Sequence, residues 1–283
     1  MTPKSGKTPD TGKKLNTGKT ATAAKAPKAG KSPRAALAPG TQPTAVEFLA
    51  RLQVRQSDVE QAKYQRYFKT GQGDYAEGDF FLGVRMGEVF TLGKEFAAMP
   101  PKEIEELLEQ DIHEARAGAV KIMALQMQKK KTTEDRRREL YELYLRRHDR
   151  INNWDLVDLG AGRVVGGWLM DKPRDPLYHL ARSEDMWERR TAIVATSAFI
   201  REGHLDDTFA IAEILLHDAE DLINKAVGGW VRDAGRSSRE RLLAFLDEHA
   251  ATMPRTALRY AIEHLGKEQR AYYLRLRDSV SPT

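Results

Sequence analysis

The chain has 283 residues, of which 41% are hydrophobic and 31% charged, and its formal net charge is +5. This balance is typical of a soluble, charge-rich helical protein. The absence of cysteine excludes disulfides, thiolate metal sites, iron–sulfur clusters and a cysteine nucleophile. No stretch approaches the roughly 18 apolar residues of a membrane helix, and the polar N-terminus lacks the apolar run of a secretory signal. We therefore expect a cytoplasmic protein.

The positive charge is concentrated at the N-terminus. Residues 1–43 contain nine lysines and arginines against the single acid Asp10, a net charge of +8, which leaves −3 for residues 44–283. Lysine, threonine, alanine, glycine and proline dominate this segment, so it cannot bury enough apolar surface to fold. We predict a disordered basic tail over residues 1–43, either a solubilising extension or a non-specific tether to nucleic acid. A folded domain over residues 44–283 follows it.

From Val46 onward the apolar residues recur at helical spacing. Three stripes show the pattern: Phe48, Leu49 and Leu52; Ile104, Leu107 and Leu108; Phe209, Ile211, Ile214 and Leu215. Helix starts are predicted at Pro100 and Pro101, at 132–135, at 237–240 and at Pro254. A cluster of glycines predicts a break near residues 69–79. There is no convincing alternating strand, so we predict an all-α fold.

A motif of one polar residue followed by small residues recurs along the domain. Its anchors are 37, 37, 35 and 34 residues apart, at Arg116, Asn153, Arg190, Lys225 and Arg259. Two helices per unit at such a period are typical of a HEAT-like helical-repeat solenoid. Second helices of such arrays line the concave face, so we predict a concave basic groove that suits a duplex backbone. Ion pairs between repeats are the competing interpretation.

Metal and dinucleotide binding are poorly supported by the sequence. No two of the seven histidines are close enough in sequence to present two ligands from one helix face. The glycine-rich run 160–167 resembles a dinucleotide-binding loop, but it has one residue too many before its third glycine and no strand before it. We interpret this run as tight helix packing, and we predict no metal and no cofactor.

Trp154 and Asp158 are four residues apart and therefore share a helix face. An aromatic ring stacks on bases or sugars and attracts cations. A carboxylate beside it stabilises the oxocarbenium-like sugar that develops as a glycosidic bond breaks, or positions the attacking water. In isolation, such a pair is more often a core aromatic residue with a capping or salt-bridged acid.

Four motifs in order resemble the AlkD-like DNA alkylation repair proteins. They lie at residues 152–158, 187–194, 225–235 and 253–262, and the resemblance spans about residues 60–270. It implies a HEAT-like solenoid that wraps duplex DNA, and monofunctional glycosylase activity that excises N3- and N7-alkylated purines. The family pair that matches Trp154 and Asp158 contacts the sugar next to the lesion. The arginines that match Arg190 and Arg232 help to hold the DNA backbone.

These arguments give a set of candidate site residues. We place Trp154 and Asp158 in the catalytic site. We expect the DNA-binding residues to be Arg116, Trp187, Arg190, Lys225, Trp230, Arg232 and Arg259.

The sequence departs from the family at one position. The family's second active-site tryptophan aligns with Gly229, whereas this chain has Trp230 one place later, about 100° further around a helix. Either a local shift in helix register lets Trp230 fill the role, or the cleft is more open here and the lesion preference differs.

Three functions remain open at this point. The first is a monomeric DNA glycosylase for cationic alkylpurines in duplex DNA. The second is a catalytically inactive HEAT-repeat protein that binds distorted DNA, and the third is a protein-binding scaffold. We rank them in that order because the four motifs favour the first.

Overall fold

The computed structural model describes residues 42–279, with side chains up to residue 276, so the predicted tail lies almost wholly outside the described part. The described residues belong to one compact unit, Leu37–Thr283. They form helices joined by turns and irregular segments, and the described residues contain one isolated bridge, between Phe80 and Ile112. The prediction of an all-α fold is confirmed. None of the helices between residues 42 and 279 is long and apolar enough to cross a membrane.

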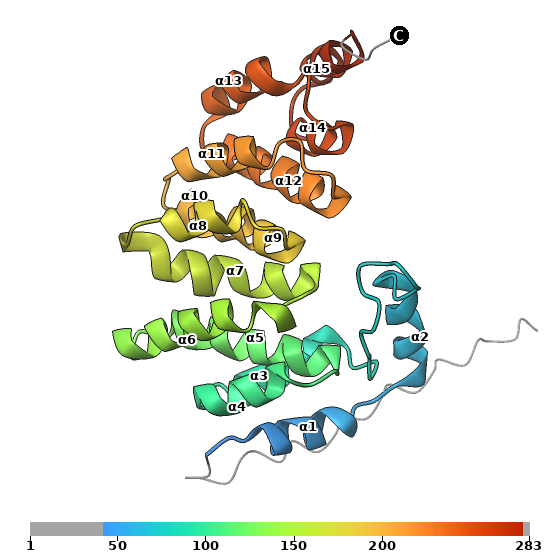
Figure 1. The fold of residues 1–283 in the computed structure, drawn as a ribbon, viewed down its shortest axis with the longest axis vertical. Coiled ribbons are helices and arrows are strands. Elements are labelled where there is room, and N and C mark those ends of the chain that lie inside the picture. The colour runs from blue at the N-terminus through green and yellow to red at the C-terminus, as the bar shows by residue number, and fades with distance from the viewer. Residues whose placement is uncertain (1–41, 280–283) are drawn as a thin grey trace, which may run out of the picture. The chain divides into compact units, whose positions relative to one another are not determined.

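One series of helices packs each against the next and builds the repeat (Figure 1). We call them the stacked helices: α3 (Met86–Glu95), α5 (His113–Gln128), α7 (Trp154–Trp168), α9 (Met186–Ala195), α12 (Asp221–Ser237) and α14 (Arg255–Ala261). Four of the five predicted anchors lie inside these helices. This arrangement confirms the prediction of a helical-repeat solenoid.

The other helices, apart from α2, each pack against a stacked helix. They are α1 (Ala45–Gln53), α4 (Pro101–Leu108), α6 (Glu134–Arg146), α8 (Asp175–Leu180), α10 (Ser197–Arg201), α11 (Asp206–Ile214), α13 (Arg239–His249) and α15 (Lys267–Ser279), with 3₁₀ turns at His148–Arg150 and Leu169–Asp171. Their starts follow the predicted signals. Pro101 is the first residue of α4, and the hydroxyls of Thr133 and Ser238 cap α6 and α13.

Glycines let the stacked helices approach one another closely. A Cβ atom at Gly160 would collide with Val120 of α5, and one at Gly166 would collide with the backbone of Ala195 in α9. Because the run 160–167 lies inside α7, its interpretation as helix packing is confirmed.

The predicted break follows α2 (Asp58–Tyr67), a helix without any buried residue. We call residues 68–79 the strap. Lys69, two residues after the end of α2, has a left-handed φ of 52°. The strap then runs through turns beside the beginning of α7 (Figure 1). Beyond the strap, the buried carboxylate of Glu114 in α5 accepts the backbone N–H groups of residues 82–84 at 2.8–3.0 Å. The strap is therefore tied to the stacked helices at its C-terminal end.

Candidate active site

Equivalent positions of neighbouring stacked helices face one cleft of about 690 Å³. Asp158, Arg190 and Lys225 are each the fifth residue of their helix, and all three line the cleft. The anchor predicted at Asn153 is wrong in register, because Asn153 precedes α7 as its N-cap. Asp158 occupies the equivalent position instead. An acid therefore faces the basic residue of the next repeat.

Aromatic side chains supply much of the wall of the cleft. They are Tyr67, Tyr75, Trp154, Trp230 and Tyr260. The indole of Trp154 stacks on Phe68, with 5.7 Å between ring centroids, and its Nε1–H donates to the hydroxyl of Tyr75 at 3.3 Å. The strap thus holds the ring of Trp154 from two sides.

The charges of the lining do not make a basic groove. The acidic residues are Asp74, Asp158, Glu220, Asp221 and Asp233. The basic residues are Lys69, Arg190, Lys225 and Arg232. Acids therefore exceed bases by one, and the predicted basic character of the groove is not shown by these residues.

Asp158 is held in a fixed orientation by Arg190. The guanidinium donates from Nε to Oδ1 at 3.0 Å and from Nη2 to Oδ2 at 2.9 Å, and its Nη1 donates to the carbonyl of Leu222 at 2.7 Å. The side chain of Arg190 is 9% exposed, whereas that of Asp158 is 40% exposed. Partial enclosure by the protein raises the pKa of Asp158, although Arg190 opposes this effect. The carboxylate thus faces the cleft while the arginine lies behind it.

The other predicted cations of the cleft are also paired with acids. Nζ of Lys225 lies 2.7 Å from Asp221. The guanidinium of Arg232 pairs with Asp233 at 3.0 Å and also with Glu263. Their positive charges are largely compensated within the protein.

Two further DNA-binding candidates, Trp187 of α9 and Arg259 of α14, do not line the cleft. Trp187 is 7% exposed and packs edge-on against Tyr75, with 6.2 Å between ring centroids. Arg259 is exposed, but its neighbour Tyr260 takes the place that lines the cleft. Trp187 therefore supports the wall from behind, and Arg259 lies outside the cleft.

Arg116 and Asn153 belong to a buried network and not to the cleft. Arg116, 2% exposed, pairs with Asp79 of the strap, and Asn153 donates to Asp79 at 2.9 Å. The ring of His113 lies between Asp79 (3.2 Å) and Asp155 (2.8 Å). The prediction that Arg116 and Asn153 line a groove is therefore wrong, because their polar atoms anchor the strap to α5 and α7.

The network makes the stability of the protein depend on pH. Burial opposes a charged imidazole, but Asp155 and Asp79 outweigh it and raise the pKa of His113 from 6.5 to about 9. A group with a raised folded pKa stabilises the fold fully below its unfolded pKa and loses this contribution as the pH rises through the folded value. We expect the free energy of unfolding to fall by up to about 3 kcal/mol between pH 6.5 and 9.5.

Urea unfolding at several pH values measures this effect. His113→Gln is the control, because it lacks the titrating group. This variant should be less stable than the wild type at pH 6.5, and its free energy of unfolding should not decline between pH 6.5 and 9.5. Equal declines in the two proteins would contradict the assignment to His113.

Asp79 makes the stability depend on pH on the acid side as well. Burial alone would raise the pKa of Asp79, but His113 and Arg116 outweigh it and lower this pKa to about 2. Its contribution is present above about pH 4 and is lost as the pH falls toward 2.

The structure also answers the question of helix register at Gly229. Helix α12 runs unbroken from Asp221 to Ser237, and both Gly229 and Trp230 line the cleft. A Cβ atom at Gly229 would meet nothing within 4 Å, whereas one at Gly228 would collide with the backbone of Ala257 in α14. The cleft is open at Gly229, and Trp230 reaches it without a shift of register.

A matched pair of variants tests this register by urea unfolding. Gly228→Ala is expected to lower the free energy of unfolding by about 1–3 kcal/mol, because α12 and α14 must move apart. Gly229→Ala is expected to raise it by up to about 1 kcal/mol, because alanine favours a helix and has room here. The opposite order of stabilities would show that α12 presents a different face to the cleft.

Several cleft residues were missed by the sequence analysis. Tyr67 and Tyr75 belong to no repeated motif, and Tyr260 directly follows the anchor Arg259. Asp79, which anchors the strap outside the cleft, is an ordinary acid in a glycine-rich segment. The one available signal was the break itself, since a long connection inside a compact helical domain is often functional.

Comparisons with known proteins agree with the fold. The sequence profile of a family described as "DNA alkylation repair enzyme" matches residues 48–265. No curated protein sequence matches the chain. A solved structure from Enterococcus faecalis, described as a "predicted DNA alkylation repair enzyme", matches with a TM-score of 0.59 at 18% identity, over 75% of this chain and 98% of that chain. At this identity the structural likeness shows the fold alone.

Proposed function

The chain belongs to the DNA alkylation repair enzyme family, and from this premise we propose that it is a DNA glycosylase that releases cationic N3- or N7-alkylated purines from duplex DNA. The observation that carries the proposal is the carboxylate of Asp158, which Arg190 fixes at the edge of an aromatic cleft. The geometry supplies a negative charge and stacking surfaces in the same place.

The lining of the cleft suits a positively charged base. Alkylation at N3 or N7 gives a purine a formal positive charge, and the faces of tryptophan and tyrosine rings attract cations. Carboxylates exceed cations among the lining residues, which adds to this attraction. A neutral purine gains less from both effects. The proposed selectivity for alkylated bases therefore rests on charge as well as on shape.

In the proposed reaction the C1′–N bond breaks and the base leaves with the bonding electron pair, which neutralises its positive charge. The sugar becomes oxocarbenium-like, and a water molecule adds to C1′ and gives its proton to solvent, which leaves an abasic site. Asp158 stabilises the sugar cation electrostatically. No general acid is required because the base departs as a neutral molecule.

Arg190 acts in this proposal as a positioning residue. Its donors are taken by Asp158 and by the carbonyl of Leu222, and it is almost fully buried. A bidentate pair fixes both the distance and the plane of the carboxylate. This role replaces the backbone contact that the family resemblance implied for Arg190.

A base-release assay tests the proposed function. Purified protein is incubated with duplex DNA treated with a methylating agent, and free 3- and 7-methylpurines are measured against the same treated duplex without protein. Release above the protein-free rate supports the glycosylase. Tight binding of the treated duplex without release would support the non-excising DNA-binding protein instead.

Tyr75 is expected to contribute to the rate through Trp154. In Tyr75→Phe the ring still packs against Trp187, but the hydroxyl that accepts the indole N–H of Trp154 is lost. A hydrogen bond of this kind contributes about 0.5–1.5 kcal/mol. We therefore expect single-turnover base release to slow by about 2- to 10-fold, and the melting temperature to fall by no more than about 6 °C.

Tyr141→Phe is the matched control for Tyr75→Phe. Tyr141 stacks on Trp168, with 5.8 Å between ring centroids, and does not line the cleft. Base release by this variant should equal that of the wild type. Equal rates in all three proteins would show that the Tyr75 hydroxyl has no part in positioning Trp154.

A further inference from the structure

Three cations from neighbouring stacked helices lie together outside the cleft. They are Lys94 of α3, Lys121 of α5 and Arg163 of α7. Within residues 42–279, no carboxylate forms an ion pair with any of these side chains, in contrast to Arg190, Lys225 and Arg232 of the cleft. We call them the cation triad.

The packing of the helices brings the triad together. The stem of Lys121 lies against Gly93, where a Cβ atom would be 3.1 Å from its Cγ, and Lys94 is the next residue. The ammonium of Lys121 lies 4.8 Å from the centre of the Phe90 ring. A glycine at position 93 therefore lets the side chain of Lys121 cross over α3.

Helix α7 completes the triad. Its Gly160 packs against Val120, the residue before Lys121. Arg163 follows Gly160 by about one turn, some 4.5 Å along the axis of α7. The guanidinium thus extends from a helix surface that is in direct contact with α5.

The electrostatics of the triad are unfavourable without a ligand. Burial, then Arg163 and then Lys94 lower the pKa of Lys121, and no carboxylate is among the groups that act on it. Like charges held together in a domain of negative net charge leave a local positive potential. An anion bound among them relieves the repulsion.

We propose that Lys94, Lys121 and Arg163 form a binding site for the backbone phosphates of duplex DNA. This inference rests on the proposed function in one respect, namely that DNA is the ligand. Arg163 follows Asp158 by five residues on α7, about 7.5 Å along the helix and about 140° around it. Asp158 therefore faces α9, where Arg190 binds it, and Arg163 faces α5. Phosphates follow one another at about 3.4 Å of axis per strand, so a duplex with its lesion at Asp158 brings further phosphates to the triad where it crosses the exposed side of α7 toward α5.

The triad also explains how a protein with a compensated cleft binds DNA. In the cleft, Arg190, Lys225 and Arg232 are engaged with acids, and a phosphate would have to compete for them. At the triad, no such competition arises. The cleft therefore selects the cationic base, and the triad provides affinity that does not depend on the lesion.

Salt titration of binding to undamaged duplex tests the proposal. The double variant Lys121→Met/Arg163→Gln is compared with the wild type by fluorescence anisotropy between 50 and 200 mM salt, roughly the range over which phosphate contacts are lost. We expect about tenfold weaker binding at the low-salt end. The slope of log K against log salt should shrink by about 0.9 for each phosphate contact removed.

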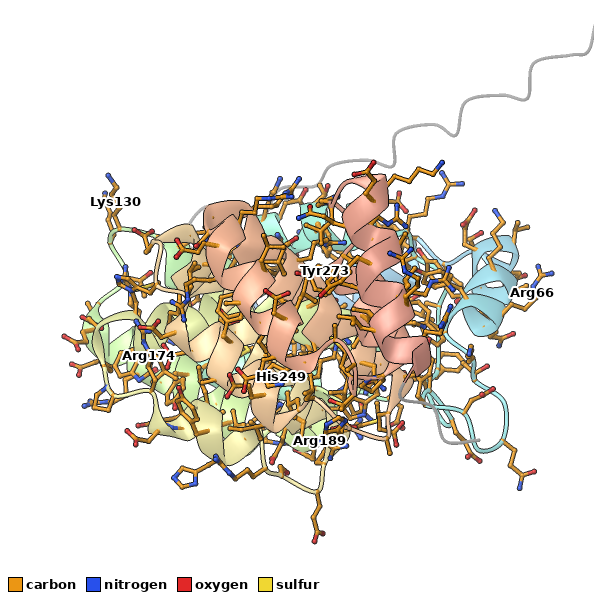
Figure 2. The ribbon with its side chains drawn as sticks, turned by 90° about the horizontal axis from the view of Figure 1, so that it is seen from above. Arg66, Lys130, Arg174, Arg189, His249 and Tyr273 are labelled. Carbon is orange, nitrogen blue, oxygen red and sulfur yellow. The ribbon has the colours of Figure 1, made fainter. Side chains whose placement is uncertain are left out.

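Lys130→Met is the matched control. Lys130 is exposed in the loop after α5, and its side chain extends away from the helices in Figure 2. This variant should keep the affinity and the slope of the wild type. An unchanged slope in the double variant, or an equal loss in Lys130→Met, would overturn the proposal.

Failure of this site is distinguishable from failure of the glycosylase. At saturating protein, the double variant should release bases at the wild-type single-turnover rate, because the cleft is intact. If the wild type releases no base but the slope still falls in the double variant, the triad stands as a DNA site without the glycosylase. Melting temperatures of the double variant should not fall, since two like charges are removed.

Discussion

Replacing Asp158 with asparagine is expected to slow base release from methylated duplex by about 100- to 1000-fold, the effect of removing one preorganised electrostatic group from a transition state. Asparagine keeps the size of the side chain and one oxygen for the guanidinium of Arg190. It removes the negative charge that stabilises the sugar cation. Single-turnover rates at saturating protein measure the chemical step, and affinity for the duplex should change by less than about threefold.

The control for Asp158→Asn must remove a comparable ion pair elsewhere. Asp207 pairs with Arg174 and accepts the hydroxyl of Tyr178 at 2.9 Å, and it does not line the cleft. Asp207→Asn should lower the melting temperature at least as much as Asp158→Asn does, yet release bases at the wild-type rate. If Asp158→Asn retained more than about a tenth of the wild-type rate, the electrostatic role of Asp158 would be wrong.

The helical repeat was predictable because it depends on local sequence. Apolar spacing, capping residues and prolines act over a few residues, and each predicted helix start at Pro101, Thr133 and Ser238 is observed. Small residues in the motifs, such as Gly228 after Lys225, reflect close packing of the stacked helices. These signals need no knowledge of distant contacts.

The partners of the predicted site residues were not predictable in the same way. The repeat showed that Arg190 and Lys225 share a helix position, but it did not show that Asp158 and Asp221 neutralise them. Because the anchor in α7 was placed at Asn153, the ion pair between Asp158 and Arg190 could not be predicted. Asp158 is the residue of α7 that is equivalent to Arg190 of α9. An ion pair between successive repeats requires the correct register at both helices.

The strap was the least predictable part of the site. The contacts of Trp154 with Tyr75 and of Asn153 with Asp79 join residues 79 and 74 positions apart in the sequence. No periodic pattern specifies such pairs. The glycines predicted a break, but the direction of the chain after a break depends on the buried groups that anchor it.

Removing the anchor of the strap is expected to have the largest effect on stability. In Asp79→Ala, Arg116 and Asn153 lose their shared acceptor, and His113 keeps Asp155 as its one acidic partner. Breaking a buried ion pair by removing one partner costs about 3–5 kcal/mol, because the other charge stays buried without compensation. We expect a loss of this size in the free energy of unfolding by urea at pH 7.

Two further variants separate this cause from a general effect of changing the strap. Glu77→Ala alters an exposed acid of the same segment, and its cost should stay below about 1 kcal/mol. The double variant Asp79→Ala/Arg116→Met removes the uncompensated charge together with its partner. Its loss should be smaller than the sum of the two single losses by at least about 1 kcal/mol. Additive losses would mean that Arg116 and Asp79 stabilise the protein independently.

The same variants connect the buried network to the chemistry of the cleft. Asp79 lies four residues after Tyr75, whose hydroxyl accepts the indole N–H of Trp154. Below the melting temperature, Asp79→Ala should therefore slow base release at least as much as Tyr75→Phe does, whereas Glu77→Ala should not. A folded Asp79→Ala protein with the wild-type rate would show that the strap stabilises the fold without positioning Trp154. A slower rate would show that one buried carboxylate serves both stability and the geometry of the cleft.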